Sequence, residues 1–174
     1  LYKYNNYGKL QINTNGTICP KPEKLKIFQN KKVFFDISNY GKLSKSVNKL
    51  IAELERLNIR YTAQPVESWQ DCGRIVNSKR TDEENKDVFG NCSENQGLTI
   101  LHGSIYLCPF AANATNLKAI PNHPKEVIDI EKCSKKDLKE RIRNLYFETS
   151  FLQACKNCNG RDHNVASINP AVQI

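Results

Sequence analysis

Seven cysteines in 174 residues are the feature that most limits what this chain can fold into. Four of them have an informative spacing. Cys92 precedes Gly103, and Cys108 follows that glycine after four intervening residues. The pair Cys155 and Cys158 comes far downstream. In a secreted protein, seven cysteines suggest disulfide bonds and one free thiol. In a cytosolic protein, clustered thiols more often bind metal or carry out redox chemistry.

The four spaced cysteines are predicted to hold one iron–sulfur cluster, which is usually bound by four thiolates. A hairpin between Leu98–Leu101 and Ser104–Leu107 would present Cys92 and Cys108, one at each strand. Gly103 permits the tight turn that such a hairpin needs. The two-residue gap of the downstream pair lets both of its thiols point to the same side of a turn. One segment can therefore bind two adjacent corners of a cluster.

Two other uses of these thiols stay open. Zinc also takes four thiolates, although its structural modules more often pair two short Cys-x-x-Cys motifs. Disulfide bonding is the other alternative. The spacing favours the cluster over both.

The remaining cysteines, Cys19, Cys72 and Cys133, are predicted to be structural. Cys72 lies near Trp69 and has a second interpretation, as a residue that faces an active-site cavity. Arg161 is a candidate neighbour of the cluster, because a fixed positive charge offsets anionic thiolates and raises the reduction potential. The alternative role for Arg161 is an ion pair that anchors the C-terminal tail.

The first 65 or so residues alternate between strand and helix patterns. The expected strands show either alternating polar and apolar residues or an enrichment in β-branched and aromatic residues. The expected helices carry apolar residues at helical spacing. Strand–helix–strand units of this length imply a parallel sheet or barrel. The expected strands are Lys9–Thr14, Lys32–Ser38 and Ile59–Ala63, and the expected helices are Pro22–Phe28 and Leu43–Leu57.

The pattern changes after Pro65. Trp69–Gly73 is a turn-rich joint, and Lys79–Lys86 is predicted to be a polar, charged loop. Ser134 and Asp137 resemble a capping box, with Asp in place of Glu or Gln. A helix is predicted after them that buries apolar residues at helical spacing, namely Leu138, Ile142 and Leu145.

The arrangement of Cys92, Gly103, Cys108, Cys155 and Cys158 resembles the twitch domain, a reduced SPASM domain, of radical S-adenosylmethionine (radical SAM) enzymes. Its signature is a cysteine, a glycine, four residues and a second cysteine, with a Cys-x-x-Cys pair downstream. A full SPASM domain would have further cysteines after the second motif, and none follows here. The resemblance therefore implies one auxiliary 4Fe-4S cluster.

Two upstream segments also resemble the radical SAM family. Ile12–Thr17 looks like the family's strand that ends in Thr-Asn-Gly, whose polar groups lie near the SAM ribose. Phe35–Ser38 looks like the next strand, on which a polar residue faces the cofactor. The resemblance implies cofactor-binding roles for Thr14, Asn15 and Ser38. Sites in parallel α/β folds form at the carboxyl ends of strands, which fits these positions.

The fold class expected from the resemblance is α/β, in two parts. Residues 1–66 would be the C-terminal part of a partial (β/α) radical SAM barrel, and residues 67–174 a small α+β twitch domain. The family's Cys-x-x-x-Cys-x-x-Cys triad and Gly-Gly-Glu strand are missing and would lie before Leu1. We therefore expect the chain to be a fragment of a longer enzyme, inactive by itself.

The resemblance also implies a function. The intact enzyme would cleave SAM reductively to a 5′-deoxyadenosyl radical, with a second 4Fe-4S cluster for that step and a reductase such as flavodoxin or ferredoxin as electron donor. An auxiliary cluster with four protein ligands would transfer electrons. The substrate would be a small molecule, such as a sugar-derived one, or a peptide. The expected location is the cytoplasm, and no apolar run reaches the roughly 20 residues that span a bilayer.

The positive charge is uneven along the chain. Up to Gln64 there are 12 Lys+Arg and 4 Asp+Glu, and the totals of 26 and 18 leave 14 of each beyond it. The lysines are spread out and lack interleaved exposed aromatics, so solvated outer helices are favoured over a nucleic-acid surface. The contrasting hypothesis is a non-enzymatic, metal-stabilised module, with zinc or an iron–sulfur cluster, whose basic half binds nucleic acid or another anionic partner.

Overall fold

The structure is a computed structural model that describes residues 7–162 and 164–170 of the chain. It contains two compact units, one formed by the chain up to Trp69 together with Asn169 and Pro170, and the other by Gln70–Ile168. The predicted joint, Trp69–Gly73, contains this division. Among the described residues, no helix is both long enough and apolar enough to cross a membrane.

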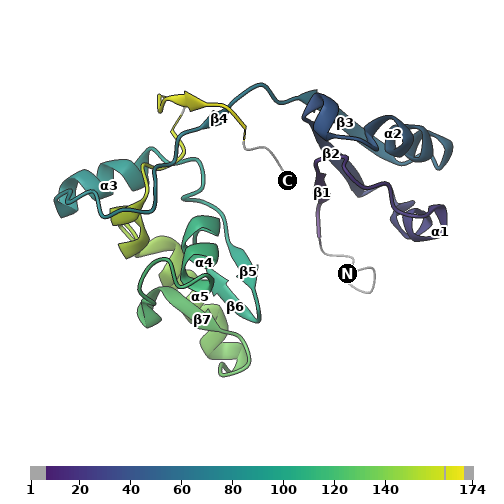
Figure 1. Ribbon diagram of the computed structural model, residues 1–174. Coiled ribbons are helices and arrows are strands. Elements are labelled where there is room, and N and C mark those ends of the chain that lie inside the picture. Colours follow the sequence, from purple (N-terminus) through teal and green to yellow (C-terminus); the bar gives the residue numbers. More distant parts are fainter. Residues whose placement is uncertain (1–6, 163, 171–174) are drawn as a thin grey trace. The chain divides into compact units, whose positions relative to one another are not determined.

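The first unit is built on a three-stranded parallel sheet (Figure 1). Its order is β1 (Leu10–Thr14), β2 (Val33–Asn39), β3 (Arg60–Pro65). Leu10 pairs with Val33, and the register carries on to the ends of the strands. The three predicted strands and their parallel arrangement are confirmed. Parallel strands need crossover connections, and here a helix in each connection returns the chain to the same edge of the sheet.

One face of this sheet is covered by helices. Leu25, in α1 (Pro22–Leu25), is fully buried, as are Leu50 and Leu54 in α2 (Val47–Arg56). They pack against alternate residues of β2, since successive strand side chains point to opposite faces. Short 3-10 helices accompany them, η1 (Lys26–Phe28) and η2 (Gly41–Leu43).

The helix predicted from Leu43 begins four residues later than expected. The chain first forms a turn around the buried Ser44. The Ser44 hydroxyl donates to the Asn15 carbonyl at 2.5 Å and accepts from the Tyr40 backbone amide at 2.8 Å. This side chain ties the loop after β1 to the loop after β2, and that tie outweighs the helical spacing of the apolar residues.

The second unit contains an antiparallel sheet of three short strands, in the order β5 (Thr99–Leu101), β6 (Ser104–Tyr106), β7 (Val127–Asp129). The predicted hairpin is confirmed in β5 and β6. His102 and Gly103 both have positive φ, 47° and 75°, as a two-residue hairpin turn requires. Two further strands, β4 (Trp69–Gln70) and β8 (Ser167–Ile168), form a separate two-stranded sheet.

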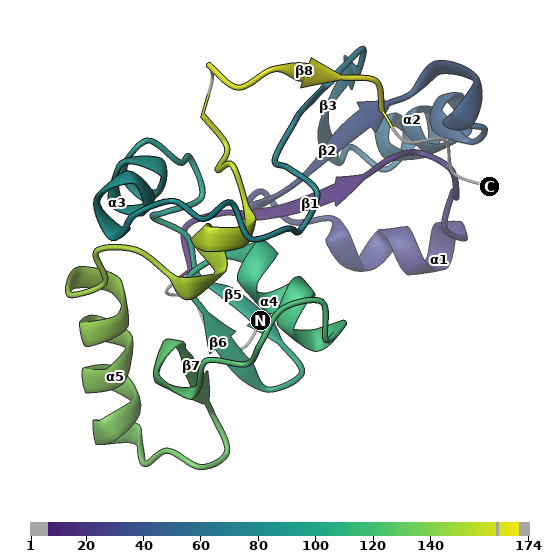
Figure 2. The ribbon, with the colours of Figure 1, turned by 60° about the vertical axis from the view of Figure 1, so that its left-hand side comes forward.

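Two helices pack on the antiparallel sheet (Figure 2). The predicted helix with a Ser134 cap is confirmed as α5 (Lys135–Phe147), and the Ser134 hydroxyl accepts from the Asp137 amide at 3.2 Å. Its Leu145 is buried, while Leu138 and Ile142 are partly buried against the same core. The other helix, α4 (Pro109–Asn116), was not predicted. It buries three alanines, Ala111, Ala112 and Ala114.

The prediction of a loop over Lys79–Lys86 is wrong, because α3 (Asp82–Gly90) begins inside it. Thr81 and Glu84 form a capping box: the Thr81 hydroxyl accepts from the Glu84 amide, and the Glu84 carboxylate accepts from the Thr81 amide. Acidic residues in the first turn also favour a helix start, since they complement the helix dipole. The polar composition that suggested a loop is therefore the composition of a helix N-terminus.

Candidate metal centre

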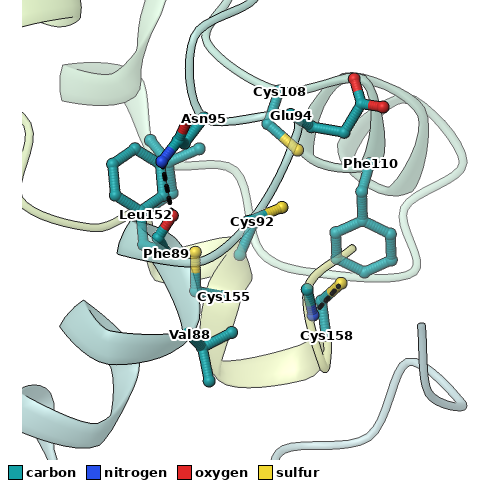
Figure 3. A pocket seen from close by; sticks show the side chains of 12 residues that line it. Val88, Phe89, Cys92, Glu94, Asn95, Cys108, Phe110, Leu152, Cys155 and Cys158 are labelled. Carbon is teal, nitrogen blue, oxygen red and sulfur yellow. Dashed lines mark hydrogen bonds between the residues drawn. The ribbon is translucent and has the colours of Figure 1, made fainter. Parts of the chain in front are cut away.

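One pocket in the second unit is lined by all four cysteines that are predicted to bind a single cluster (Figure 3). Cys92 follows α3, Cys108 is the N-cap of α4, and Cys155 and Cys158 lie in and just after the 3-10 helix η4 (Gln153–Asn157). Three segments distant in sequence thus bring their thiols to the same place. The pocket contains about 350 Å³ of empty space, some of it open to solvent, and its other lining is largely apolar, including Val88, Phe89, Phe110 and Leu152.

The predicted position of Cys92 is wrong in one respect. Cys92 does not extend the hairpin but lies in the turn that ends α3, where its backbone amide donates to the Phe89 carbonyl at 3.1 Å. Cys108 is close to the prediction, because it follows β6 after a single residue. The unpredicted α3 is therefore the element that positions one of the four thiols.

The Cys155–Cys158 segment is a tight turn, as predicted. The Cys158 amide donates to the Cys155 carbonyl at 3.2 Å, and the Cys155 amide donates to the Leu152 carbonyl at 2.8 Å. Leu152 is 1% exposed and lies in the core of the unit. Because Leu152 is buried and joined to the turn by this bond, the hydrophobic core anchors the segment that carries two of the thiols.

Two backbone amides donate to the sulfur atoms. The Gly160 amide lies 3.3 Å from Cys158 Sγ, and the Arg161 amide lies 3.2 Å from Cys92 Sγ. Sulfur is a weak acceptor as a thiol and a better one as an anion, so such amides favour thiolate ligands. Gly160 has a φ of +78°, and a Cβ there would approach Val88 Cγ1 to 3.2 Å. A side chain at this position would be strained by the positive φ and crowded against the end of α3.

The Arg161 side chain makes the ion pair that was the alternative prediction for it. Its guanidinium lies 2.5 Å from the Glu94 carboxylate and also donates to Gln70 at 3.3 Å. Glu94 itself lines the pocket. The contact of Arg161 with the candidate ligands is thus made by its backbone amide, while its side chain joins β4 to the loop after α3.

Burial favours the protonated form of three of the thiols. Desolvation raises the pKa of Cys155 to about 12 and that of Cys158 to about 11, since the charged form loses its hydration. Desolvation also raises the pKa of Cys108, and the Ala111 and Phe110 amides oppose that shift. Neighbouring thiols add to the shifts. A metal group that binds here must therefore displace protons as well as bind sulfur.

The possible donors in the pocket are thiols, the type of ligand that zinc and iron–sulfur clusters both take. All seven cysteines are free thiols. Within residues 7–162 and 164–170, no three or more His, Cys, Asp or Glu side chains are arranged to hold a single metal ion. A mononuclear site needs its ligands within about 2.0–2.3 Å of one point.

The other three cysteines have different surroundings. Cys19 and Cys133 are partly buried against the cores of the first and second units respectively, which agrees with a structural role. Cys72 lies near the pocket without lining it: its carbonyl accepts from the Asn159 amide at 2.9 Å. Desolvation raises the pKa of Cys72, and the nearby charge of Arg161 opposes that shift.

The three predicted cofactor-binding residues lie at the carboxyl ends of β1 and β2 in the first unit. Thr14 pairs in register with Ile37, so its side chain is on the helix-covered face, and its hydroxyl accepts from the Gly16 amide at 3.3 Å. Ser38, one position on, is on the opposite face. The Asn15 side chain accepts from the Thr17 amide at 3.1 Å. The structure brings the three to one edge of the sheet but not to one face.

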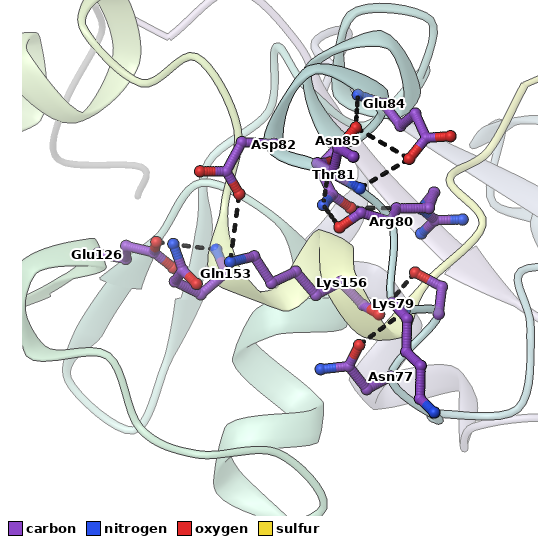
Figure 4. A network of polar contacts seen from close by, with 11 residues as sticks. Asn77, Lys79, Arg80, Thr81, Asp82, Glu84, Asn85, Glu126, Gln153 and Lys156 are labelled. Carbon is purple, nitrogen blue, oxygen red and sulfur yellow. Dashed lines mark hydrogen bonds and ion pairs between the residues drawn. The ribbon is translucent and has the colours of Figure 1, made fainter.

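Comparison with models of known protein families and with curated proteins finds no match for this sequence. The candidate site is therefore defined by its own residues. Sequence reasoning missed the residues that hold the Cys155–Cys158 turn from outside, above all Arg80. Figure 4 shows Arg80 beside Thr81 and Asn85. Only the capping box beginning at Thr81 marked that part of the chain as structured.

Proposed function

We propose that the chain binds one auxiliary 4Fe-4S cluster through Cys92, Cys108, Cys155 and Cys158, and that it is the C-terminal part of a radical SAM enzyme. One observation carries the proposal: thiols from three separate segments line a single, largely apolar pocket. The backbone amides of Gly160 and Arg161 on two of the sulfurs support it, because such bonds stabilise and tune thiolate ligands.

The proposed role of the site is electron transfer. A 4Fe-4S cluster supplies one-electron chemistry, and four protein ligands leave no iron position for substrate. The chain's own residues bind the cluster and limit its contact with water, since Val88, Phe89 and Phe110 surround the thiols. The amides on the sulfurs offset negative charge and so favour the reduced state.

The first unit would contribute the SAM side of the enzyme. Its parallel sheet supports the proposal that residues 1–66 are part of a partial barrel, with residues 67–174 as the twitch domain. Thr14, Asn15 and Ser38 are proposed to lie near SAM, at the carboxyl ends of their strands. The proposed substrate is a small molecule or peptide, the electron donor a flavodoxin or ferredoxin, and the location cytoplasmic.

Anaerobic reconstitution of the full chain with iron and sulfide tests the proposal. We expect about four iron atoms per chain and a broad visible absorption that dithionite bleaches. Replacing Cys155 or Cys158 with alanine should abolish that absorption, while Cys133→Ala, a control thiol that is partly buried outside the pocket, should retain it. A colourless protein with one zinc per chain, or the same colour in all variants, would contradict the assignment.

A second candidate function is supported by a separate feature of the first unit. Basic residues surround one shallow depression at the amino ends of the three parallel strands, namely Lys9, Lys31, Lys32 and Arg60. A concentration of positive charge can bind an anionic partner such as nucleic acid. Titration with a labelled RNA at low and moderate salt tests this: Lys31→Ala with Arg60→Ala should weaken binding and reduce its salt dependence if the depression is used.

A further inference from the structure

The segment before α3 holds the Cys155–Cys158 turn by hydrogen bonds to the backbone carbonyls of the turn. The Ser78 amide and hydroxyl both donate to the Lys156 carbonyl, at 2.8 Å and 3.1 Å. Arg80 Nη2 donates to the Cys155 carbonyl at 2.7 Å and also to the Cys158 carbonyl. Residues about 75 positions away in sequence therefore bind three of the four carbonyls of the turn.

Arg80 is itself held in place. Its Nε donates to the Asn85 side-chain oxygen at 3.3 Å, and Asn85 is 0% exposed. The Asn85 amide group in turn donates to the Thr81 carbonyl at 2.8 Å and to the Arg80 carbonyl at 3.3 Å. The capping box of Thr81 and Glu84 fixes the start of α3 beside it. The guanidinium is thus aimed at the turn by a buried amide and a capped helix.

We propose that Arg80 is a positioning residue for the metal centre: it fixes the separation of Cys155 and Cys158 before any metal group binds. One nitrogen that bridges two carbonyls restrains both ends of the Cys-x-x-Cys turn, and a planar guanidinium loses little freedom in doing so. A preorganised pair of ligands binds more tightly, because the cost of ordering the turn is met in folding. The identity of the bound group rests on the proposed function, whereas the restraint of the turn does not.

The other contacts of the turn show why Arg80 is singled out. At the opposite end of η4, the Glu126 carboxylate accepts from the Gln153 amide at 2.9 Å, ahead of both cysteines. Lys156 pairs with Asp82 at 3.4 Å through its side chain, and this exposed pair is weakly held. Among the side-chain contacts described, only the guanidinium of Arg80 bridges the two cysteine carbonyls. Its charge also lies beside residues whose thiolates are anionic when they bind.

Hydrogen–deuterium exchange on the metal-free full chain tests the restraint directly. In Arg80→Ala we expect the amides of residues 153–160 to exchange faster while those of the hairpin, residues 99–106, keep the wild-type rate. Arg80→Lys, which retains a charge and donors but not the planar fork, should be intermediate. The matched control is Arg74→Ala, because Arg74 is exposed, pairs with Asp71 at 2.8 Å and makes none of the hydrogen bonds described to the turn's carbonyls.

A second measurement uses the chain reconstituted with iron and sulfide. Loss of the cluster to a chelator should be about 10- to 100-fold faster in Arg80→Ala than in wild type, the size typical of residues that orient metal ligands. Arg74→Ala should not change it. Unchanged exchange and unchanged chelator loss in Arg80→Ala would overturn the inference. Equally faster amide exchange in the hairpin and in the turn of both Arg80 variants would also overturn it, because Arg80 would then stabilise the whole unit rather than the turn.

The two experiments separate this inference from the proposed function. If wild type takes up no iron but residues 153–160 still exchange faster in Arg80→Ala, the proposed cluster is wrong and the restraint of the turn stands. If wild type forms the cluster and Arg80→Ala matches it in both measurements, the proposed cluster stands and the restraint of the turn by Arg80 is wrong.

Discussion

The two units of this chain are stabilised by different means. Of the eight largest fully buried side chains among the described residues, five are apolar residues of the first unit: Leu25, Val33, Ile37, Leu50 and Leu54. The second unit supplies only Leu107, Leu152 and the polar Asn85. Its three-residue strands and alanine-lined helix bury little apolar surface per residue. We therefore expect the second unit to depend more on polar contacts and on the cluster proposed for its cysteines. The proposed site is thus expected to stabilise the second unit as well as to carry out chemistry.

Removal of the bound group should produce the largest difference between the units. When the reconstituted chain is treated with a chelator, we expect amide exchange to rise strongly around the four cysteines of the pocket and to stay unchanged in β1, β2 and β3. The reason is that binding free energy of a metal group acts as folding free energy for the unit that holds it. Exchange mass spectrometry with and without the chelator measures both units together. Equal responses in the two units would show that the second unit does not depend on its site.

Leu54→Ala should have the next largest effect, and in the opposite unit. Leu54 is 0% exposed in the core of the first unit, so truncation should cost about 2–5 kcal/mol of that unit's stability. Cluster loading should remain at the wild-type level. Ile51→Ala, on the same helix at a partly exposed position, is the control and should cost less. The measurement is urea unfolding followed by amide exchange in each unit. A loss of cluster loading in Leu54→Ala would show that the site in the second unit depends on the core of the first unit.

Asn85→Ala tests the polar part of the second unit. Its removal leaves Arg80 Nε without its side-chain acceptor and takes one of two hydrogen bonds from the Thr81 carbonyl, which should cost about 1–3 kcal/mol. Asn113→Ala is a matched control, because Asn113 also donates to a carbonyl four residues earlier, that of Pro109 at 2.8 Å, but in an exposed position. Urea unfolding of both variants should show a clear loss only for Asn85→Ala, and equal losses would indicate that burial of this amide is unimportant.

Alkaline pH should produce the smallest effect, confined to the metal-free second unit. Desolvation raises the pKa of Cys155 from 9.0 to about 12 and that of Cys158 to about 11, so the folded form holds these protons more tightly than the unfolded form. The resulting stability is fully present below pH 9 and is lost as the pH rises from about 9 to 12.

Urea midpoints across that window measure this effect. A variant with serine at both positions should lose less stability than wild type as the pH rises, because it lacks the two titrating thiols. The same slope in both proteins would indicate that other groups, not these thiols, cause the alkaline loss.

Sequence patterns predicted the first unit well, because its strands and helices bury regular apolar faces. The second unit was harder. Helix α3 has few apolar residues, so it shows no apolar stripe, and only the capping box of Thr81 and Glu84 marked its start. The small side chains of α4 gave no periodic signal. Strand β7 is three residues long and exists because it pairs with β6.

The four pocket cysteines could be selected from the sequence, since their spacing is unusual and their chemistry is shared. Their arrangement could not be predicted as fully. Cys92 was expected on a hairpin strand because Gly103 suggested a turn between the two cysteines, but the chain between Cys92 and β5 contains a further turn. Arg80 was out of reach of such reasoning, because its partners are backbone carbonyls and carry no side-chain signature. Contacts of this kind become visible only once the fold is known.

Gly160 has a consequence for how this site can vary through evolution. Its positive φ and the 3.2 Å approach to Val88 that any Cβ would make exclude other residues there without a shift of α3. A lineage that keeps the pocket is therefore constrained at a position that binds nothing through a side chain. In homologous chains, the pattern Cys-x-x-Cys-x-Gly should discriminate a retained pocket from a chance pair of cysteines, and loss of the glycine should accompany loss of Cys92.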